Sequence, residues 1–458
     1  MTKPESSSQS RQQSQKDVVT RITVFGYKSI AKEQSIEVQP LTILAGANSS
    51  GKSSFLQPLL LLKQTLEATY DPGALLLDGP NIRFTAVEQM LAKCGEKSNG
   101  ESFSVGIGVG SGTSVRLTFE QLGGKGVHIR EMFYEAPGES CRWREGMGHE
   151  EIMSMLPAAL GDFAKGLAGN KDFEWIVERD RCFLGMKIGI KGKAISARLP
   201  FGPQLPFGFS PCGMVEPHIR AIIHLPGLRG NPRRFYPKTA VGSTFPGVFQ
   251  DYTASVVTKW QEDCKHKLDS LGRDLKMLGL TWKVVARPID DTQVELKVGR
   301  LADAARGGGW DLVNIADVGF GVSQALPVLV ALRAAESGQI VYLEQPEIHL
   351  HPKAQLAMAR VLADAANRGV RVIAETHSIL LLLGIQSLVA KGDLAKEKVV
   401  LHWFQRGKED GCTEVRSANL DETGAFGDWP EDFAETELKA QSAYLDAVEA
   451  KQMKETND

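Results

Sequence analysis

Two separated parts of the chain show the apolar patterns of strands and helices. Near the N-terminus, residues 18–30 and 34–45 are rich in Val, Ile and Thr, which is typical of strands. A loop rich in glycine and serine follows at residues 46–54, and residues 52–69, which lack glycine, predict a helix. The predicted order is therefore strand, flexible loop, helix.

A second set of elements begins near residue 284. Residues 313–338 predict a loop that leads into a helix, and residues 354–369 predict an amphipathic helix that ends at Gly369. Apolar strands that alternate with helices are typical of a mainly parallel sheet with helices on both faces, so the predicted fold class is α/β. The short apolar strands of this set are expected at 339–344, 370–375 and 398–406.

The segment between these two sets has a mixed pattern. From about residue 99 the chain is alternating and glycine-rich, which predicts an antiparallel β subdomain. Helical segments at 149–169 and 255–278 flank a loop rich in Pro, Gly and Phe at 199–213. The predicted organisation is a disordered tail (1–17), the first half of a core domain (18–128), an inserted α/β lobe (129–285), the second half of the core domain (286–425) and a C-terminal helix (426–458).

Composition narrows the class of protein. The chain has 458 residues and a net charge of −2 at pH 7, so no global basic surface indicates nucleic-acid binding. Six cysteines are scattered without a CxxC pair, the N-terminal residues are polar, and the longest apolar runs are too short to span a bilayer. These features predict a cytoplasmic protein with free thiols.

The glycine-rich loop carries the clearest chemistry. Residues 46–53, GANSSGKS, fit the pattern G-x-x-x-x-G-K-[ST] of phosphate-binding loops. Small residues let backbone N–H groups converge on phosphate oxygens, Lys52 can reach the β- and γ-phosphates, and Ser53 can ligate Mg²⁺. The alternative is a chance match by a simple turn, but the flanking strand and helix favour a site for Mg-ATP. The predicted nucleotide-binding residues are Gly46, Ala47, Asn48, Ser49, Ser50, Gly51, Lys52, Ser53 and Ser54.

Two strand ends supply partners for this loop. Glu344 ends the apolar strand at 339–344, where a carboxylate can hold Mg²⁺ together with Ser53. His377 follows the next strand, where its side chain can contact the γ-phosphate. The alternatives are an acid in solvent and a structural histidine. The presence of the phosphate loop favours the catalytic roles.

These motifs together resemble a known family. The segments FGYKSI (25–30), VGFGVSQALPVL (318–329), LEQPEIHLHP (343–352) and ETHS (375–378), with Asn48, follow in the order of the ABC-type ATPase domain of the RecF, SMC and overcoming-lysogenisation-defect (OLD) class. The resemblance covers residues 19–95 and 300–405, and more weakly HLPGLRGNPRRFYP in the middle. It implies an ABC-type P-loop head in which two copies dimerise around two ATP molecules. Each nucleotide then touches one copy's phosphate loop and the other copy's signature helix.

The resemblance assigns further residues and shows two departures. Gly319, Gly321 and Ser323 match the signature, although the family usually has serine where Gly319 stands. The family commonly has a catalytic glutamate where this chain has Gln345. Glutamine can orient a water molecule but cannot take its proton, so we expect slow hydrolysis and a long-lived ATP-bound dimer. The alternatives are that Glu347 or Glu375 supplies the missing carboxylate, or that the glutamine was engineered.

Weaker signals lie outside these motifs. His349 and His351 are two positions apart, but no further ligand clusters near them, so we expect them at the dimer interface and not at a zinc site. Gln89 is a candidate for the contact between the two halves of the ATPase. Residues 229–238 carry a basic cluster with two aromatics, which suits a nucleic-acid backbone or a loop packed on its own domain: Arg229, Arg233, Arg234, Phe235, Tyr236 and Lys238.

The predicted function is an ATP-gated sensor or scaffold that controls a separate effector in bacterial anti-phage defence. The absence of a membrane span and of a long heptad region argues against a transporter and an SMC-like tether. Too little chain follows residue 405 for the nuclease domain of OLD proteins, so the effector, for instance a nuclease, is expected on another chain. The expected assembly is a homodimer or a higher homo-oligomer. The alternatives are a DNA repair or recombination ATPase and an ATP-bound scaffold that does not hydrolyse ATP.

Overall fold

The computed structural model describes most of the chain between residues 18 and 427. Its described residues are 18–93, 100–110, 112–123, 126–155, 173–190, 193–194, 208–209, 211–301, 303, 309–427, 442 and 445. The predicted tail at 1–17 lies outside this set, as do most of the predicted C-terminal helix and much of the loop at 199–213. No helix in the described part is both long enough and apolar enough to span a bilayer.

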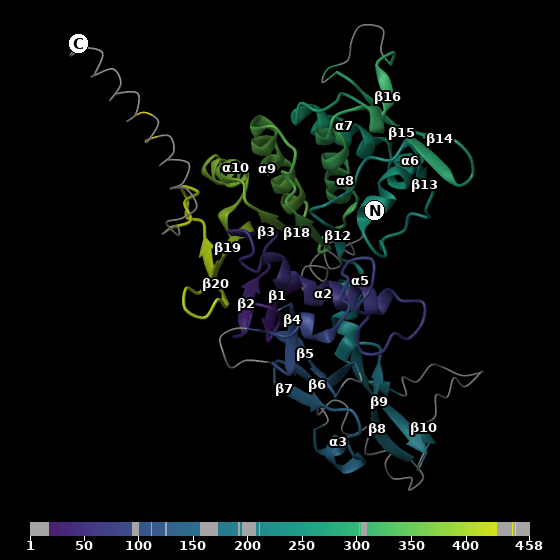
Figure 1. Cartoon of the computed structure of the whole chain (residues 1–458), viewed down its shortest axis with the longest axis vertical. Helices are drawn as coiled ribbons and strands as arrows, with labels where there is room; N and C mark the ends of the chain where they lie inside the picture. The colour runs from purple at the N-terminus through teal and green to yellow at the C-terminus, as the bar shows by residue number, and fades with distance from the viewer. Residues whose placement is uncertain are drawn as a thin grey trace, which may run out of the picture.

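A central six-stranded sheet organises the core (Figure 1). Its first five strands are parallel and the last is antiparallel, so the predicted α/β class with a mainly parallel sheet is confirmed. All six residues of β3, an inner strand of this sheet, are buried, which shows that both faces of the sheet are covered. The strand order is β12 (Ile223–Leu225), β17 (Ile340–Glu344), β18 (Arg371–Thr376), β3 (Leu41–Gly46), β19 (Val399–Arg406) and β20 (Thr413–Asn419).

Alternate residues of the central strands enter two different hydrophobic cores. Ile43 and Leu343 pack with the helices that lie above the sheet in Figure 1, whereas Leu44 and Tyr342 pack with α2 (Lys52–Glu67) below it. This division follows from the two-residue period of a strand. The helices above the sheet are α8 (Phe320–Ala334), α9 (Pro352–Asn367) and α10 (Ile379–Ala390).

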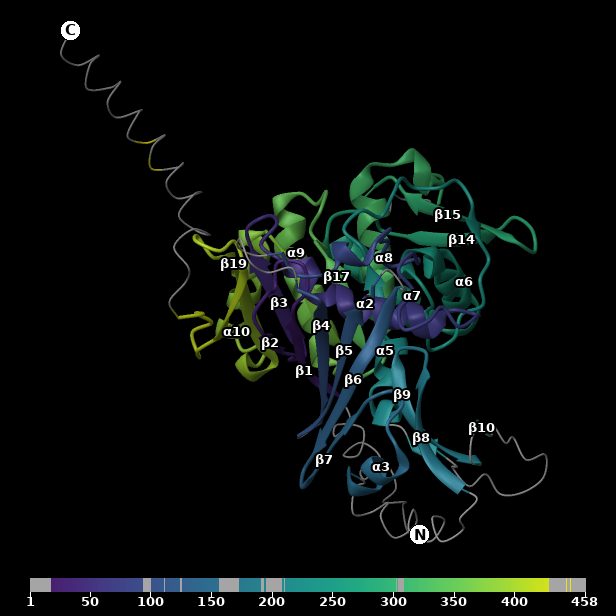
Figure 2. The same cartoon turned by 60° about the horizontal axis from the view of Figure 1, so that its bottom comes forward.

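Antiparallel sheets extend the molecule beyond α2. Figure 2 shows strands β4 to β7 side by side in front of α2 and the central sheet. A six-stranded sheet has the order β2 (Gln34–Glu37), β1 (Val19–Phe25), β4 (Ser102–Val109), β5 (Thr113–Gln121), β6 (Val127–Ala136) and β7 (Glu139–Trp143). The next sheet contains β8 (Phe173–Asp180), β9 (Phe183–Ile190), β10 (Lys193–Ala194) and β11 (Gly208–Phe209), near α3 (His149–Met155).

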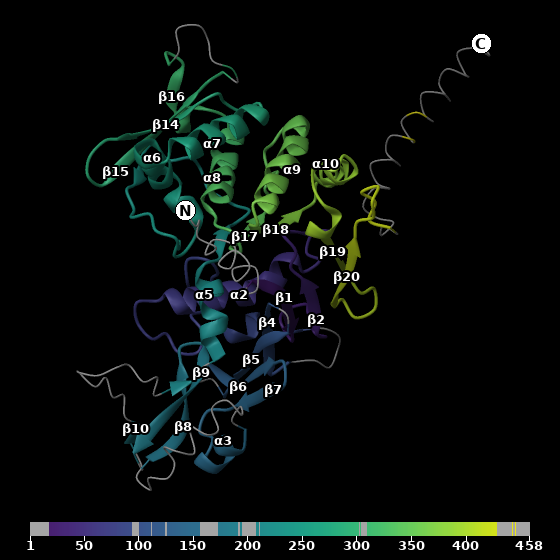
Figure 3. The same cartoon turned by 180° about the vertical axis from the view of Figure 1, so that it is seen from behind.

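A third antiparallel sheet forms a separate lobe with α8, as Figure 3 shows from behind. Its strands are β13 (Tyr236–Pro237), β14 (Val284–Pro288), β15 (Gln293–Gly299) and β16 (Leu312–Asn314). Helix α6 (Thr253–Asp263) packs against this sheet, and both α6 and α7 (Lys265–Met277) pack against α8. The described residues also contain α5 (Glu216–Arg220) and 3₁₀ turns at Val87–Gln89, Pro211–Met214, Phe249–Tyr252, Ile315–Asp317 and Lys396–Lys398.

The residues predicted as one inserted lobe, 129–285, are divided among these bodies. Strand β12 is the edge of the central sheet, and β7 completes the first antiparallel sheet. Helices α6 and α7 belong with the second half of the chain. The sequence pattern did not reveal this division because β12 has only three residues.

Candidate functional site

The glycine-rich loop joins β3 to α2, as its motif requires. Gly46 and Gly51 have φ angles of 144° and 106°, which residues with a side chain rarely adopt. A Cβ atom on Gly46 would lie 2.2 Å from the carbonyl oxygen of Phe404, and one on Gly51 would lie 2.4 Å from Oγ1 of Thr413. Strands β19 and β20 therefore lie directly against the loop, and these contacts leave room only for glycine at positions 46 and 51.

Lys52 stands inside this loop at the first position of α2. Its Nζ donates hydrogen bonds to the carbonyl oxygens of Gly46 at 3.0 Å and Ala47 at 2.8 Å. Burial lowers the pKa of Lys52. A phosphate in the loop would give this ammonium group an anionic partner. The loop residues Ala47, Asn48 and Ser49 are exposed, whereas Ser50 is buried and Ser53 and Ser54 are half-buried.

Two carboxylates lie side by side beside the loop. Glu344 and Glu375 are paired in register on the parallel strands β17 and β18, and Glu375 also pairs with Leu44 of β3. The Ser53 hydroxyl donates to Oε2 of Glu375 at 2.7 Å, and the Tyr342 hydroxyl donates to the other oxygen. Burial, and then the charge of Glu344, raise the pKa of Glu375 to about 7. In this structure the Ser53 hydroxyl thus contacts Glu375, an acid to which the sequence did not assign this contact.

Glu344 is held by other partners. His224 Nε2 lies 3.2 Å from Oε1 of Glu344, and the backbone N–H of Gly227 donates to Oε2 at 3.1 Å. Burial alone would raise the pKa of Glu344, but the bonds from His224 and Gly227 and the charge of Arg229 outweigh it and lower the pKa. Glu344 is therefore maintained as a carboxylate, which is the form that a cation requires.

The protonated nitrogen of His224 can be assigned from its surroundings. Nδ2 of Asn81 lies 3.0 Å from His224 Nδ1 and donates to the carbonyl oxygen of Gly247 at 3.1 Å. The Gly247 oxygen fixes which end of the amide faces the ring, since only the amide nitrogen can donate to it. Nδ1 of neutral His224 must then accept, and Nε2 carries the proton donated to Glu344. The ring also stacks on Tyr342, with centroids 5.3 Å apart and planes 11° apart.

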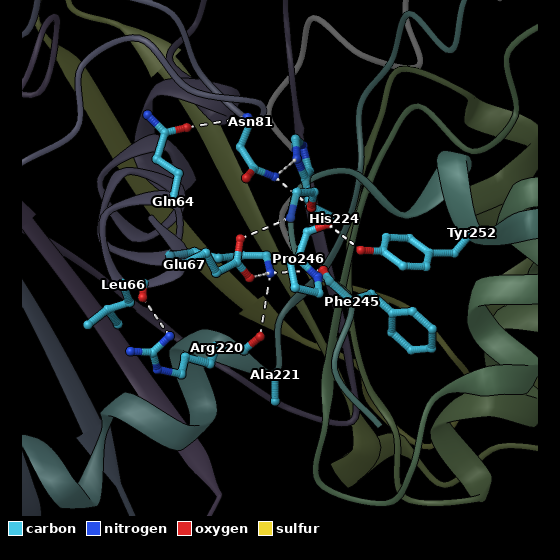
Figure 4. A network of polar contacts seen from close by, with 12 residues as sticks. Gln64, Leu66, Glu67, Asn81, Arg220, Ala221, His224, Phe245, Pro246 and Tyr252 are labelled. Carbon is cyan, nitrogen blue, oxygen red and sulfur yellow. Dashed lines mark hydrogen bonds and ion pairs between the residues drawn. The ribbon is translucent and has the colours of Figure 1, made fainter. Parts of the chain in front are cut away.

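Figure 4 shows that Asn81 and His224 belong to a larger polar network that reaches α2. Gln64 accepts a hydrogen bond from the backbone N–H of Asn81 at 3.3 Å, and Glu67 accepts one from Gly247 at 2.9 Å. Lys63 is fully buried, forms an ion pair with Glu67 and donates to the Phe245 carbonyl at 3.1 Å. The helix that begins at the phosphate loop is thereby connected to the residues that hold Glu344.

The structure brings the predicted catalytic residues Gln345 and His377 together with Asn48. All three line one open hollow, with Glu347, Ile348, His349, Gln355 and Ser378. Gln345 has a φ of 46°, an uncommon conformation for this residue type. Burial, and then the charge of Lys52, lower the pKa of His377, whereas its hydrogen bond to the backbone of Gly46 raises it. The net effect favours a neutral imidazole beside the loop.

Glu347 is the buried acid of this hollow. Its Oε1 accepts a hydrogen bond from the Thr376 hydroxyl at 2.6 Å and another from the backbone N–H of His377 at 3.1 Å. Its Oε2 is buried and has no hydrogen-bond partner in the part of the chain that the structure describes. Burial raises the pKa of Glu347. Glu347 lines the hollow together with Gln345, whereas Glu375 does not. Of the two alternative acids, Glu347 is therefore the one at the place where the attacking water is expected.

The predicted basic surface at residues 229–238 needs a correction for Arg229. This side chain is only 7% exposed, so it cannot contact a nucleic acid on the surface. It donates instead to the carbonyl oxygens of Glu344 at 2.8 Å and Gln345 at 3.3 Å. Burial lowers its pKa to about 10, which still leaves it charged at neutral pH. Arg229 is thus a support for the end of β17.

The other basic residues of this loop are exposed, and two have acidic partners. Arg234 forms an ion pair with Asp317 at 2.7 Å, and Arg233 lies 3.9 Å from Asp251. Lys238 is exposed. The acidic partners reduce the positive potential that this loop offers to a polyanion.

The signature residues lie at the start of α8, next to His349, which lines the hollow that contains Asn48. Gly319 precedes the helix, and an added Cβ there would meet nothing within 4 Å. An added Cβ on Gly321 would lie 3.5 Å from the carbonyl oxygen of His349. The Ser323 hydroxyl donates to the carbonyl of Phe320 at 3.1 Å. Within one chain these residues do not line the hollow beside the phosphate loop.

The weaker candidates have local contacts. The His349 ring lies 5.7 Å from that of Phe320, and His351 caps α9 by accepting from the backbone N–H of Lys353. Gln89, the candidate for the contact between the two halves of the ATPase, bonds to Thr85 at the surface. No cluster of three or more His, Cys, Asp or Glu residues suited to a metal occurs among the described residues.

Several functional contacts were not identified from the sequence: those of His224, Asn81 and Tyr342. The available signal was a histidine and a tyrosine inside otherwise apolar strands. The oxygen donors at the site, Ser53, Glu344 and Glu375, fit Mg²⁺, which prefers hard oxygen ligands and completes its shell with water and phosphate. Because protein residues alone do not form a cluster, bound phosphate would have to supply part of the shell.

Comparisons with known proteins agree with this chemistry over part of the chain. Residues 288–383 match the family model described as "AAA domain, putative AbiEii toxin, Type IV TA system". This segment contains Gly319, Glu344, Gln345 and His377, but not the phosphate loop. No curated protein matches the chain.

Solved structures of SMC heads are also similar, each with 12% identity. An SMC head bound to the C-terminal winged-helix domain of ScpA matches over 88% of this chain and 98% of its own, with a TM-score of 0.45. The SMC head domain from Thermotoga maritima covers 87% and 98%, with a TM-score of 0.40. An Smc head with an extended coiled coil, bound to the C-terminal domain of ScpA derived from Pyrococcus furiosus, covers 88% and 96%, with a TM-score of 0.39. The family match and the phosphate-loop geometry together identify an AAA-type P-loop ATPase domain in this chain.

Proposed function

We propose that this protein binds Mg-ATP at residues 46–54 and hydrolyses it slowly. The observation that carries the proposal is the convergence of the phosphate loop with the ends of β17 and β18. Ser53 and Glu375 are 322 positions apart and hydrogen-bonded, and His377 contacts the loop through Gly46. A simple glycine-rich turn would not bring a lysine, two carboxylates and a neutral histidine to one place.

Each residue then has a role that follows from its chemistry. The backbone of the loop binds phosphate at the N-terminus of α2, and Lys52 neutralises phosphate charge. Ser53 and Glu344 hold Mg²⁺, which stabilises the charge that develops on the phosphate oxygens. Gln345 orients the attacking water, and His377 hydrogen-bonds the γ-phosphate. Because Gln345 cannot accept a proton, turnover is slow.

The signature helix supports a role for a second copy of the chain. Gly319 has open space around it, and the neighbouring Phe320 is 50% exposed. The N-terminus of α8 therefore presents a positive helix end and an exposed apolar ring, and neither lines the hollow beside the chain's own phosphate loop. We infer that the nucleotide of a partner copy occupies this end, so ATP controls dimerisation.

The biological role that we propose is control of a separate effector in anti-phage defence. The matched family model is described as a putative AbiEii toxin of a type IV toxin–antitoxin system, which supports a role in a defence or toxin–antitoxin system. A stable ATP-bound dimer suits a sensor that holds its effector until a trigger releases it.

Nucleotide binding and turnover test the biochemical part. The native chain is expected to bind a fluorescent ATP analogue in Mg²⁺ and to turn over ATP slowly. Lys52→Ala should lose both properties, whereas Lys391→Ala, at an exposed position beyond α10, should keep both. Sedimentation with a non-hydrolysable analogue should show a dimer that Lys52→Ala does not form. The proposed function is wrong if the native chain binds no nucleotide, or if Lys52→Ala binds it equally well.

A further inference from the structure

Glu375 is a buried acid that the sequence suggests only as an alternative source of the carboxylate missing at position 345. It is only 3% exposed and lies on the central strand β18, between Glu344 and the phosphate-loop strand β3. Burying a carboxylate in a sheet is costly unless its oxygens are satisfied. Its retention next to the loop therefore calls for a specific partner.

That partner is the serine of the phosphate loop. Ser53 donates its hydroxyl proton to Glu375 Oε2 at 2.7 Å, an ordinary distance for an O–H···O hydrogen bond. A serine hydroxyl has one proton and two lone pairs, so donating the proton to Glu375 leaves the lone pairs to face a cation on its other side. The contact thus orients Ser53 for metal binding.

Tyr342 holds the other oxygen of the Glu375 carboxylate. Its hydroxyl donates to Oε1 of Glu375, and its ring is stacked on His224, which in turn donates to Glu344. His224 and Tyr342 are register partners on β12 and β17, as Glu344 and Glu375 are on β17 and β18. Two stacked rings therefore hold two neighbouring carboxylates, one each.

The location of Glu375 distinguishes this role from that of a catalytic base. The open hollow where an attacking water is expected is lined by Asn48, Gln345 and Glu347, but not by Glu375. An acid that contacts Ser53 lies on the metal side of the phosphates. Two negative charges in a poorly solvated place attract a divalent cation more strongly than one.

We propose that the divalent-cation site has two carboxylates, with Glu344 facing the cation and Glu375 positioning Ser53 and adding a second negative charge. Tyr342 is the residue that positions Glu375. This inference rests on the proposed nucleotide site, because phosphate completes the shell of the cation.

The test measures metal and nucleotide binding separately on the full chain. Mn²⁺ affinity is measured by electron paramagnetic resonance with a saturating non-hydrolysable ATP analogue, and analogue affinity is measured in EDTA. Glu375→Gln should weaken Mn²⁺ binding about tenfold or more. Glu375→Leu, which also removes the acceptor for Ser53, should weaken it further. Tyr342→Phe should have a smaller effect of about threefold.

The metal-free affinity for the analogue should stay within about twofold in these variants, which a general loss of structure would not allow. Glu336→Gln, an exposed acid at the end of α8, is the matched control and should behave like the native chain. If Glu375→Gln and Tyr342→Phe bind Mn²⁺ as tightly as the native chain, the inference is wrong while the proposed function stands. If the native chain does not bind the analogue at all, both fail.

Discussion

His224 Nε2 lies 3.2 Å from Oε1 of Glu344, although the two residues are 120 positions apart in the chain. Asn81 determines that this nitrogen carries the proton, because its amide group donates to Nδ1. A short edge strand, at the start of the segment that the family resemblance covers only weakly, thus supplies the donor that orients the metal-site acid.

Replacing His224 should weaken metal binding without preventing the fold. His224→Phe keeps the stacking on Tyr342 but removes the donor to Glu344, so Glu344 loses its orientation. We expect the Mg²⁺ concentration for half-maximal turnover to rise about tenfold, as is usual for outer-shell partners of a metal ligand. His224→Gln retains a donor and should recover part of the effect. Equal Mg²⁺ dependence in native and His224→Phe proteins would contradict this role.

Gln345→Glu should accelerate ATP turnover about tenfold or more, because a carboxylate can take the proton of the attacking water. Gln345→Leu, which cannot orient water at all, should be slower than the native chain. Single-turnover measurements with saturating enzyme report the chemical step directly. If native turnover is brisk and Gln345→Glu does not change it, Glu347 is the next residue to replace, by Glu347→Gln.

Gly51→Ala should destabilise the protein by more than the strain of its positive φ angle alone. Gly51 and Gly73 both have positive φ angles, of 106° and 90°, but only Gly51 has a neighbour where a Cβ would go. Gly73→Ala should cost about 1–2 kcal/mol from backbone strain alone. Gly51→Ala should lower the melting temperature further and abolish nucleotide binding, since Thr413 Oγ1 would lie 2.4 Å from the new methyl group. Equal melting temperatures of the two variants would show that Thr413 of β20 moves to make room for the methyl group, and would contradict this prediction.

The central fold followed from the sequence because its strands are apolar and its motifs are local. Residues 46–53 fix a loop between a strand and a helix, and the strands before Glu344 and His377 were placed within one or two residues. The strand expected at 18–30 instead ends at Phe25, because Gly26 turns with a φ of 70° against the backbone of Ser102.

The contacts between distant segments did not follow from the sequence. Nothing in the local sequence indicates that β12, with three residues, pairs with β17. Nor does it indicate that the hydroxyl of Ser53 is hydrogen-bonded to Glu375. Arg229 looks like a surface cation in sequence because its neighbours are polar, yet its side chain folds inward to the carbonyls of β17. These contacts join segments that are more than a hundred residues apart, and a local sequence pattern does not show which distant segments meet.

The raised pKa of Glu375, about 7, makes stability depend on pH in the nucleotide-free protein. Between an unfolded value near 4.5 and this folded value, the folded chain binds more protons, so its stability falls as pH rises. The loss from this group amounts to about 3 kcal/mol over the interval. Glu375→Gln cannot titrate, so in EDTA its melting temperature relative to the native chain should increase from pH 5 to pH 8. A constant difference over this range would contradict the raised pKa.

Double-stranded DNA should have little effect on turnover. Arg229 is buried, and Arg233 and Arg234 have Asp251 and Asp317 as partners, so this loop offers a polyanion little positive charge beyond that of the exposed Lys238. We expect the combined change of Arg233→Glu and Arg234→Glu to leave both turnover and DNA affinity at low salt unchanged. DNA-stimulated turnover that this double variant removes would favour the repair ATPase instead.

The order of strands in the central sheet has a consequence for synthesis of the protein. Strand β3, which ends in the phosphate loop, is made early, yet both of its neighbours, β18 and β19, come from residues 371–406. A nascent chain therefore carries an unpaired β3 until residues 371–406 have left the ribosome, and contacts this distant in sequence form late. Chains that stop before this segment should be unable to bind nucleotide, so only copies translated beyond residue 406 could enter an ATP-held pair.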